Sequence, residues 1–197
     1  MSVRKAIAEK DGIYFVTFTC TDWLPLFSIC NGYDVVYNWF DVLKEKGHYI
    51  IGYVIMPHHV HALIAFSNTG KRINTIISNG KRFMAYAFVE RLTQQNRVNI
   101  LLQLKQSLNN TEKKEGKLHH VFETSFDWKE CRTDKFIEQK LNYMHWNPCK
   151  GNKLAELPEQ YIHSSAKFYI LNEQGIYPVT SFTELEDIDL TNKLKMP

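Results

Sequence analysis

The chain has 197 residues, of which 44% are hydrophobic and 13% aromatic, a size and composition that suit one domain with a well-filled core. It contains no apolar run of about 18 residues and no apolar N-terminal stretch of signal-peptide length, so we expect a cytoplasmic protein with no membrane partner. A net charge of +3 and a pI of about 8.6 favour an anionic partner only weakly, so a nucleic-acid binder of this composition must concentrate its basic residues on one face.

Strand and helix signals alternate in the first part of the chain. Residues 14–20 alternate aromatic or branched side chains with threonine, and this period of two predicts a strand. Residues 23–27 include a proline and are expected to form a loop. A helix with one apolar face is predicted from Asn31 or Asp34 to about Glu45.

Residues 48–66 are rich in β-branched and aromatic side chains, which disfavours a helix, and they are interrupted at Pro57. We predict two strands here, 49–56 and 59–66, joined by a tight turn at Pro57-His58.

The following part is mainly helical. Apolar residues recur at three- and four-residue steps over residues 71–92, which predicts a long helix. The polar residues 93–117 predict a partly helical insertion followed by a mobile loop. Alternation over residues 119–126 predicts a fourth strand, and a last helix is predicted from about residue 135 to 147, where Pro148 ends it.

The predicted order is strand, helix, strand, strand, helix, strand and a further helix. This order indicates an α+β class, a ferredoxin-like split β-α-β palm in which an antiparallel sheet carries helices on one face, with a further helix added at the C-terminal side. We expect one domain over residues 1–170, with 93–117 as an insertion, and a C-terminal tail over 171–197 to which the sequence assigns no role.

His59-Val60-His61 is the strongest chemical signal in the chain. Residues two apart on a strand point to the same face, about 6.6 Å apart along the backbone, so two imidazoles can project side by side while Val60 points into the core. Such a pair can begin a divalent metal site. The alternative is two histidines on a polar sheet face without a metal.

Tyr143 and Asn147 form the second signal, because residues four apart share one face of a helix. The amide oxygen of Asn147 can serve as a third ligand; the alternative is a surface tyrosine and a helix-ending asparagine. Two imidazoles and one amide oxygen leave positions open for a phosphate, and mixed N/O ligation suits Mg²⁺ or Mn²⁺. A tyrosine beside that cation would be a better nucleophile, because the cation favours the phenolate.

Four ordered motifs resemble those of the single-tyrosine HUH transposases (His-hydrophobic-His), and most closely the REP-associated tyrosine transposases of bacteria. Where that family usually carries M-P-N-H-V-H-L-L, residues 56–63 read M-P-H-H-V-H-A-L, and its K-R-R/F-x-x-Y segment is matched by K-R-F-M-A-Y at 81–86. Its Y-I-H-x-N-P-V-K-x-G resembles Y-M-H-W-N-P-C-K-G at 143–151, and its P-x-x-Y-x-x-S-S resembles P-E-Q-Y-I-H-S-S at 158–165. The resemblance covers about residues 12–170.

The resemblance implies that His59, His61 and Asn147 are the metal ligands and that Tyr143 is the nucleophile. It implies a transposase-type endonuclease and strand transferase that acts on single-stranded or hairpin DNA through a 5′-phosphotyrosine, associated with the bacterial nucleoid. A homodimer remains open, as does the placement of the tyrosine in cis or in trans. His58 replaces the family's asparagine and could compete for the metal, although strand geometry favours the 59/61 pair.

Four basic residues are candidate DNA contacts: Arg72, Lys81 and Arg82 on the long helix, and Lys150 after the catalytic helix. The alternative for each is a solvated surface position. The four tryptophans are expected mainly in the core, although Trp146, beside Asn147, could stack on a base.

Two other functions compete with the transposase hypothesis. One is a catalytically silent, sequence-specific DNA-binding protein derived from a transposase, which would bind a hairpin without cutting it. The other is an unrelated metal-dependent phosphoesterase that uses water as its nucleophile and does not need Tyr143.

Overall fold

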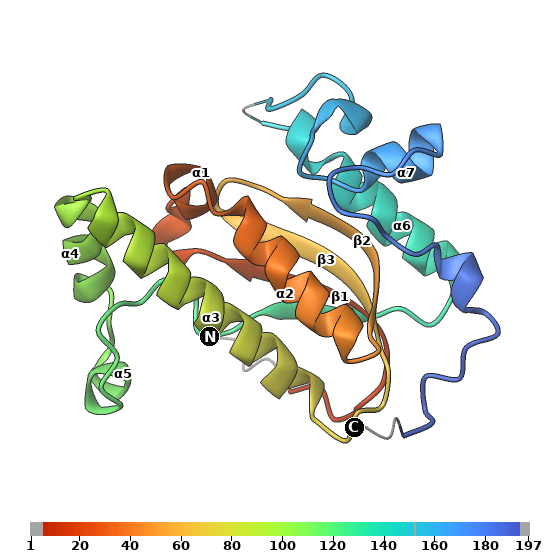
Figure 1. The fold of residues 1–197 in the computed structure, drawn as a ribbon, viewed down its shortest axis with the longest axis horizontal. Coiled ribbons are helices and arrows are strands. Elements are labelled where there is room, and N and C mark those ends of the chain that lie inside the picture. Colours follow the sequence, from red (N-terminus) through yellow and green to blue (C-terminus); the bar gives the residue numbers. More distant parts are fainter. Residues whose placement is uncertain (1–5, 152, 194–197) are drawn as a thin grey trace.

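A computed structural model describes residues 6–151 and 153–193 of the chain (Figure 1). Its centre is a four-stranded antiparallel sheet in the order β2-β3-β1-β4. The strands are β1 (Gly12–Thr19), β2 (Tyr49–Ile55), β3 (His59–Phe66) and β4 (Asp127–Glu130). Because β3 lies between β1 and β2, the segment from β1 to β3 is a split β-α-β unit. The α+β, ferredoxin-like fold expected from the sequence is therefore confirmed.

Two long helices cover one face of the sheet. Helices α2 (Tyr33–Glu45) and α3 (Ile73–Gln94) lie side by side across it (Figure 1). Their apolar faces bury a large cluster, the main core, together with alternate residues of the strands such as Val16 and Val60. Gly80 permits this pairing of helices, because a Cβ there would lie 2.4 Å from the indole nitrogen of Trp39.

The opposite face of the sheet carries helix α6 (Asp134–His145), which contacts β2 and β3. Its inward residues Ile137, Leu141 and Met144 join the outward residues of the strands in a smaller cluster, the second core. Thr133 begins the helix, since its hydroxyl accepts a hydrogen bond from the Phe136 amide at 3.3 Å. The sheet is therefore covered on both sides, and β3 is buried along its whole length.

Some predicted elements differ from the structure. The strand expected over residues 119–126 is wrong: that segment contributes only one isolated bridge, Phe122 to Cys20, and the fourth strand is β4. The loop expected over 23–27 contains the short helix α1 (Leu26–Ile29), preceded by a 3-10 turn (Thr21–Trp23).

The insertion over 93–117 is more ordered than its composition indicates. It folds as α4 (Val98–Gln106) and α5 (Asn110–Lys114). In place of the expected mobile loop, α5 has a capping box between Asn109 and Glu112. The buried Glu112 carboxylate also lies 2.7 Å from His120 Nδ1, which closes the segment on itself.

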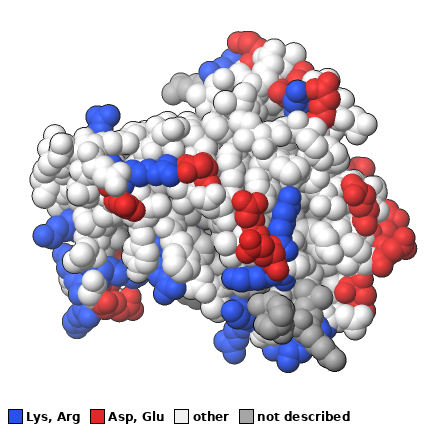
Figure 2. Space-filling model, in the orientation of Figure 1, with Lys and Arg blue, Asp and Glu red and all other residues white. Residues whose placement is uncertain are grey.

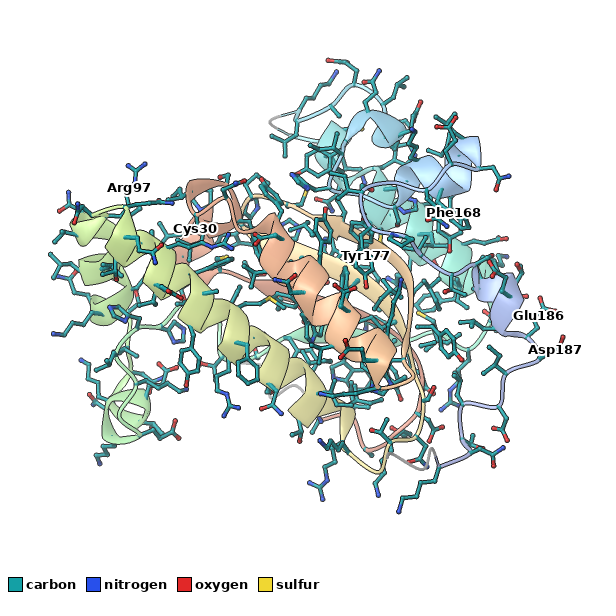
Figure 3. All side chains as sticks on the ribbon, in the orientation of Figure 1. Cys30, Arg97, Phe168, Tyr177, Glu186 and Asp187 are labelled. Atoms are coloured by element: carbon teal, nitrogen blue, oxygen red, sulfur yellow. The ribbon has the colours of Figure 1, made fainter. Side chains whose placement is uncertain are left out.

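The C-terminal part follows the molecular surface. Two 3-10 turns, Asn147–Cys149 and Pro158–Gln160, follow α6, and α7 (Ala166–Leu171) comes next. The segment after α7 packs on both cores and contains a last 3-10 turn, Phe182–Leu185. Tyr177 stacks on Tyr37 of α2 and donates a hydrogen bond to Asp41 at 2.8 Å (Figure 3). The tail is thus packed against the domain as far as residue 193.

Both margins of the sheet are covered or short. Residues 163–165 run along β2, with hydrogen bonds from the Ile55 amide to the His163 carbonyl and from the Ser165 amide to the Tyr53 carbonyl. At the other margin, β4 has only four residues, of which Asp127 and Lys129 are exposed.

Figure 2 shows the face that carries α2 and α3, where basic and acidic side chains are mixed. An acidic group lies along the edge where Figure 3 labels Glu186 and Asp187. This face therefore offers no continuous basic surface. Among the described residues, no helix combines the length and apolarity needed to span a bilayer.

Candidate active site

The site is built first on strand β3, where side chains alternate between the two faces of the sheet. His59 and His61 stand opposite Thr19 and Thr17 of the neighbouring β1, on the face that carries α6. Val60 points the other way and is fully buried in the main core. The sequence prediction for this strand is confirmed: the two imidazoles share one face.

The two imidazoles converge on one point. His59 Nε2 and His61 Nε2 are 3.1 Å apart. The Thr17 hydroxyl lies 2.6 Å from His61 Nδ1. When Nδ1 carries the proton and donates it to that hydroxyl, the Nε2 lone pair of His61 faces the site. Within the described chain, His59 Nδ1 is buried without a hydrogen-bond partner.

Both imidazoles favour the neutral form. Burial lowers the pKa of His59 to about 4, with a smaller effect from His58. Burial also lowers the pKa of His61 well below its ordinary value, aided by His59 and Lys140. Neutral imidazole is the form that can act as a metal ligand.

Helix α6 and the turn after it bring in the other two predicted residues. The Asn147 side-chain amide nitrogen lies 3.2 Å from His61 Nε2, and the Tyr143 ring centroid is 5.5 Å from that of His61. The Tyr143 ring also meets Phe15 edge-on at 6.1 Å and is 46% exposed, so its hydroxyl is accessible. All four predicted side chains therefore meet within a single chain.

The placement of Asn147 differs from the sequence expectation. It does not lie on the last turn of the helix, because α6 ends at His145 and Asn147 begins the separate 3-10 turn with Pro148. Proline disfavours a helical conformation for the residue before it and cannot donate the next helical hydrogen bond. The change of helix type still leaves the amide beside His61.

A close approach of α6 to the sheet makes this meeting possible. A Cβ at Gly52 on β2 would lie 2.6 Å from Leu141 Cδ2 and 3.3 Å from the Ser165 hydroxyl. A larger residue there would force the Leu141 side chain, or α6 with it, to shift away from β2. The register of β2 also shifts between Ile50 and Gly52, which places Ile51 in the second core.

The residues present fit a divalent cation. Two nitrogen ligands about 2.0–2.1 Å from one cation, in cis or tetrahedral positions, lie about 2.9–3.4 Å apart, and the observed Nε2 separation is 3.1 Å. The two ends of an asparagine amide are interchangeable by rotation, so the Asn147 oxygen can face the same point. Within residues 6–151 and 153–193, no group of three or more His, Cys, Asp and Glu side chains could hold a metal, so a third protein ligand at this site would have to be of another type, such as the Asn147 amide.

The converging side chains line a cleft of about 1140 Å³. Lys140 and Lys150 lie near the tyrosine, with their ammonium nitrogens 5.7 and 5.4 Å from the centre of the Tyr143 ring. Asp127 and Glu130 of β4 also line the cleft. The cleft is therefore basic beside the phenol and carries both charge signs at β4, where Lys129 also lines it.

The four candidate DNA contacts have different surroundings. Lys150 is exposed and lines the cleft. Arg72 and Arg82 are exposed on α3 and are not among the residues that line it. Lys81 is 9% exposed, and its ammonium donates to the carbonyls of residues 123–125, the shortest bond being 2.6 Å to Glu123. Lys81 thus holds the segment before β4, and its side chain is not presented to a ligand.

Several site residues were not singled out from the sequence. Thr17 reaches the site through strand pairing, and Trp23 through the turn after β1, which no local motif shows. The tryptophan expectation is wrong at two positions, since Trp23 is 65% and Trp146 is 42% exposed. Trp23 lines the cleft, with its ring centroid 4.9 Å from that of His58.

Comparison with known proteins supports the fold. No protein-family model matches the chain, and no curated protein sequence matches it significantly. A solved structure of a REP-associated tyrosine transposase bound to a REP hairpin matches over 100% of both chains, with 16% sequence identity and a TM-score of 0.58. A protein from Deinococcus radiodurans assigned as a transposase covers 72% of this chain and 95% of its own, with 10% identity and a TM-score of 0.35, which is too low to support an argument. The first match confirms, at the level of fold, the resemblance seen in the motifs.

Proposed function

We propose that the protein is a metal-dependent endonuclease and strand transferase of the tyrosine-transposase kind, acting on single-stranded or hairpin DNA. The observation that carries the proposal is the meeting of Tyr143 and Asn147 from the α6 region with His59 and His61 of β3 in one cleft. The fold shared with a transposase whose solved structure contains a REP hairpin supports the choice of substrate.

The proposed reaction transfers the 5′ phosphoryl group of one phosphodiester to the tyrosine. The Tyr143 hydroxyl attacks the scissile phosphorus and loses its proton to solvent. A bond forms between the phenol oxygen and phosphorus, the bond from phosphorus to the 3′ oxygen breaks, and that oxygen takes a proton from solvent. The products are a 5′-phosphotyrosine and a free 3′ hydroxyl, so the phosphodiester energy is retained for rejoining to another 3′ end.

The surrounding residues position the phosphate and stabilise its charge. His59, His61 and Asn147 would hold Mg²⁺ or Mn²⁺, which supplies Lewis-acid polarisation of the phosphate. Lys140 and Lys150 lie 5.7 and 5.4 Å from the centre of the Tyr143 ring, where their charges favour a bound phosphate. Thr17 holds the His61 ring by its contact with Nδ1.

The test is incubation of the full chain with a DNA hairpin carrying single-stranded flanks in the presence of Mn²⁺. A covalent protein–DNA adduct that survives denaturation is expected, and Tyr143→Phe should abolish it. Tyr86→Phe is the matched control, because Tyr86 is exposed to 64% on α3 and outside the cleft. Equal adduct formation by Tyr143→Phe would refute the nucleophile assignment.

Other outcomes separate the alternatives. Tight hairpin binding without cleavage under any divalent metal would favour the catalytically silent DNA-binding protein. Metal-dependent cleavage that leaves no adduct and continues in Tyr143→Phe would favour a phosphoesterase that uses water.

A further inference from the structure

The backbone at the end of β1 holds Trp23 in an unusual conformation. Asp22 and Trp23 both have left-handed backbone angles, with φ of 53° and 56°. Non-glycine residues adopt this region at an energetic cost, and a bulky side chain there is an outlier that points to a functional constraint.

The neighbouring contacts fix this turn. The Cys20 amide donates to the His58 carbonyl at 2.8 Å, and the Thr21 amide donates to the Val121 carbonyl at 3.0 Å. The Asp22 carboxylate accepts a hydrogen bond from the Ser107 hydroxyl at 3.0 Å. The turn is therefore tied to the β2–β3 connection, to the segment before β4 and to the end of α4.

The consequence is a tryptophan on the cleft wall instead of in the core. The Trp23 ring is 65% exposed, tilted against His58 with centroids 4.9 Å apart and edge-on to His59 at 5.9 Å. Tryptophan is highly buried on average, so such exposure beside two imidazoles is not explained by packing.

We propose that the indole face of Trp23 is a stacking platform for one nucleobase of single-stranded DNA, next to the phosphate bound at the histidines. This inference rests on the proposed function and adds a base-binding subsite to it. Lys140 and Lys150 supply positive charge for the strand on the side of Tyr143, whereas at β4 the charge of Lys129 is offset by Asp127 and Glu130. An aromatic face binds any base, so the platform contributes affinity and position without reading sequence.

The test measures DNA binding separately from cleavage. In the Tyr143→Phe background, Trp23→Ala should weaken binding of a fluorescent hairpin with a single-stranded 5′ extension by about 5- to 150-fold. Trp23→Phe keeps an aromatic ring and should recover most of the affinity. Tyr86→Ala is the matched control, because Tyr86 is 64% exposed on α3 outside the cleft and should leave binding unchanged.

An abasic scan tests the stacking itself. A single abasic site is moved along the extension, and binding by Tyr143→Phe is measured for each position. At one position the loss of affinity should equal the loss that Trp23→Ala causes with intact DNA. At that position Trp23→Ala should cause no further loss, which shows coupling between the ring and that base. Melting curves of each variant establish that it is folded.

Three results would overturn the inference. One is unchanged affinity in a folded Trp23→Ala variant, which would leave the proposed function standing if Trp23→Ala alone still formed the adduct. Another is an equal loss at every abasic position, with no coupling. Absence of DNA binding in the Tyr143→Phe parent would overturn the inference together with the proposed function.

Discussion

At the scale of single residues, Thr17 determines how His61 faces the cleft, because its hydroxyl lies 2.6 Å from Nδ1. Loss of such a supporting contact typically weakens metal binding by about 10- to 100-fold. We therefore expect Thr17→Val to lower the Mn²⁺ affinity measured by titration calorimetry by that amount. Thr19→Val, on the same strand face, is the control. Equal affinities for both variants would show that the hydroxyl does not orient the ring.

Lys150 and Lys81 are both basic, but their surroundings predict opposite defects. Lys150 is exposed at the cleft, so Lys150→Ala should weaken DNA binding and reduce the slope of log affinity against log salt by about 1. Lys81 is buried against three carbonyls, so Lys81→Met should instead lower the free energy of unfolding by about 1–3 kcal/mol. Salt-dependent fluorescence polarisation and urea unfolding separate the two effects. If Lys81→Met alone reduced the slope of log affinity against log salt, the assignment of Lys150 as the DNA contact and Lys81 as a structural residue would be contradicted.

His48 predicts a loss of stability in acid. Its Nδ1 accepts a hydrogen bond from the Ser67 amide at 3.1 Å, and burial, aided by Lys46, lowers its pKa to about 4. Between about pH 6.5 and 4 the unfolded chain binds a proton that the folded chain does not, so stability falls as pH falls through this window. The urea concentration at the unfolding midpoint should fall when the pH is lowered from about 7 to about 5, and the fall should be smaller for the His48→Gln variant. An identical drop would assign the acid sensitivity to other groups.

At the scale of elements, the seating of α6 on the sheet controls the site. Gly52→Ala would place a Cβ 2.6 Å from Leu141 Cδ2, and overpacking of this kind costs about 1–3 kcal/mol. Because α6 carries Tyr143, adduct formation should fall by more than the loss of stability explains.

The control for this prediction is Gly80→Ala, which creates a similar clash with Trp39 between α2 and α3, away from the cleft. It should destabilise the protein while the folded fraction keeps its adduct rate. Equal effects of both variants on that rate would argue against a specific role for the seating of α6. Urea unfolding and single-turnover adduct formation give the two quantities.

Elements with strong local patterns were predictable from the sequence. The strands around Pro57 and the helices α2 and α3 match their predicted ranges to within about two residues, because the periodicity of apolar residues is local. The cap of α2 was not predicted correctly: it is Gly32, without a side-chain hydrogen bond, and not Asn31 or Asp34. The fourth strand was not predictable, because Asp127–Glu130 has no apolar alternation and exists only by pairing with β1. Apolar and polar side chains alternate over residues 119–126, but this segment lies beyond the part of β1 with which β4 pairs.

The same division applies to the site. His59, His61, Tyr143 and Asn147 lie in local motifs with meaningful spacing, so the sequence identified them, and the fold brings them together. The exposure of Trp23 depends on a left-handed turn held by distant contacts, which no spacing reveals. Burial of Lys81 likewise depends on the segment 123–125 folding over it.

At the scale of the whole molecule, the site is complete within one chain. The Tyr143 ring lies 5.5 Å from His61 of the same chain, so no second copy is needed to assemble it. Mixing Tyr143→Phe with His61→Ala should therefore give no adduct, because neither chain holds both groups. Wild-type protein diluted with either variant should lose activity only in proportion. Restored adduct formation in the mixture would show that the tyrosine acts on a neighbouring copy.

The covered margins of the sheet also limit how copies of this chain can meet. The backbone groups of β2 are already engaged by residues 163–165, and β4 offers a short run bearing both charge signs. Unsatisfied strand edges are the usual template for fibril growth, and charged, short edges resist it. Strand addition is therefore disfavoured at both margins, and helix or loop surfaces are the better candidates for self-association.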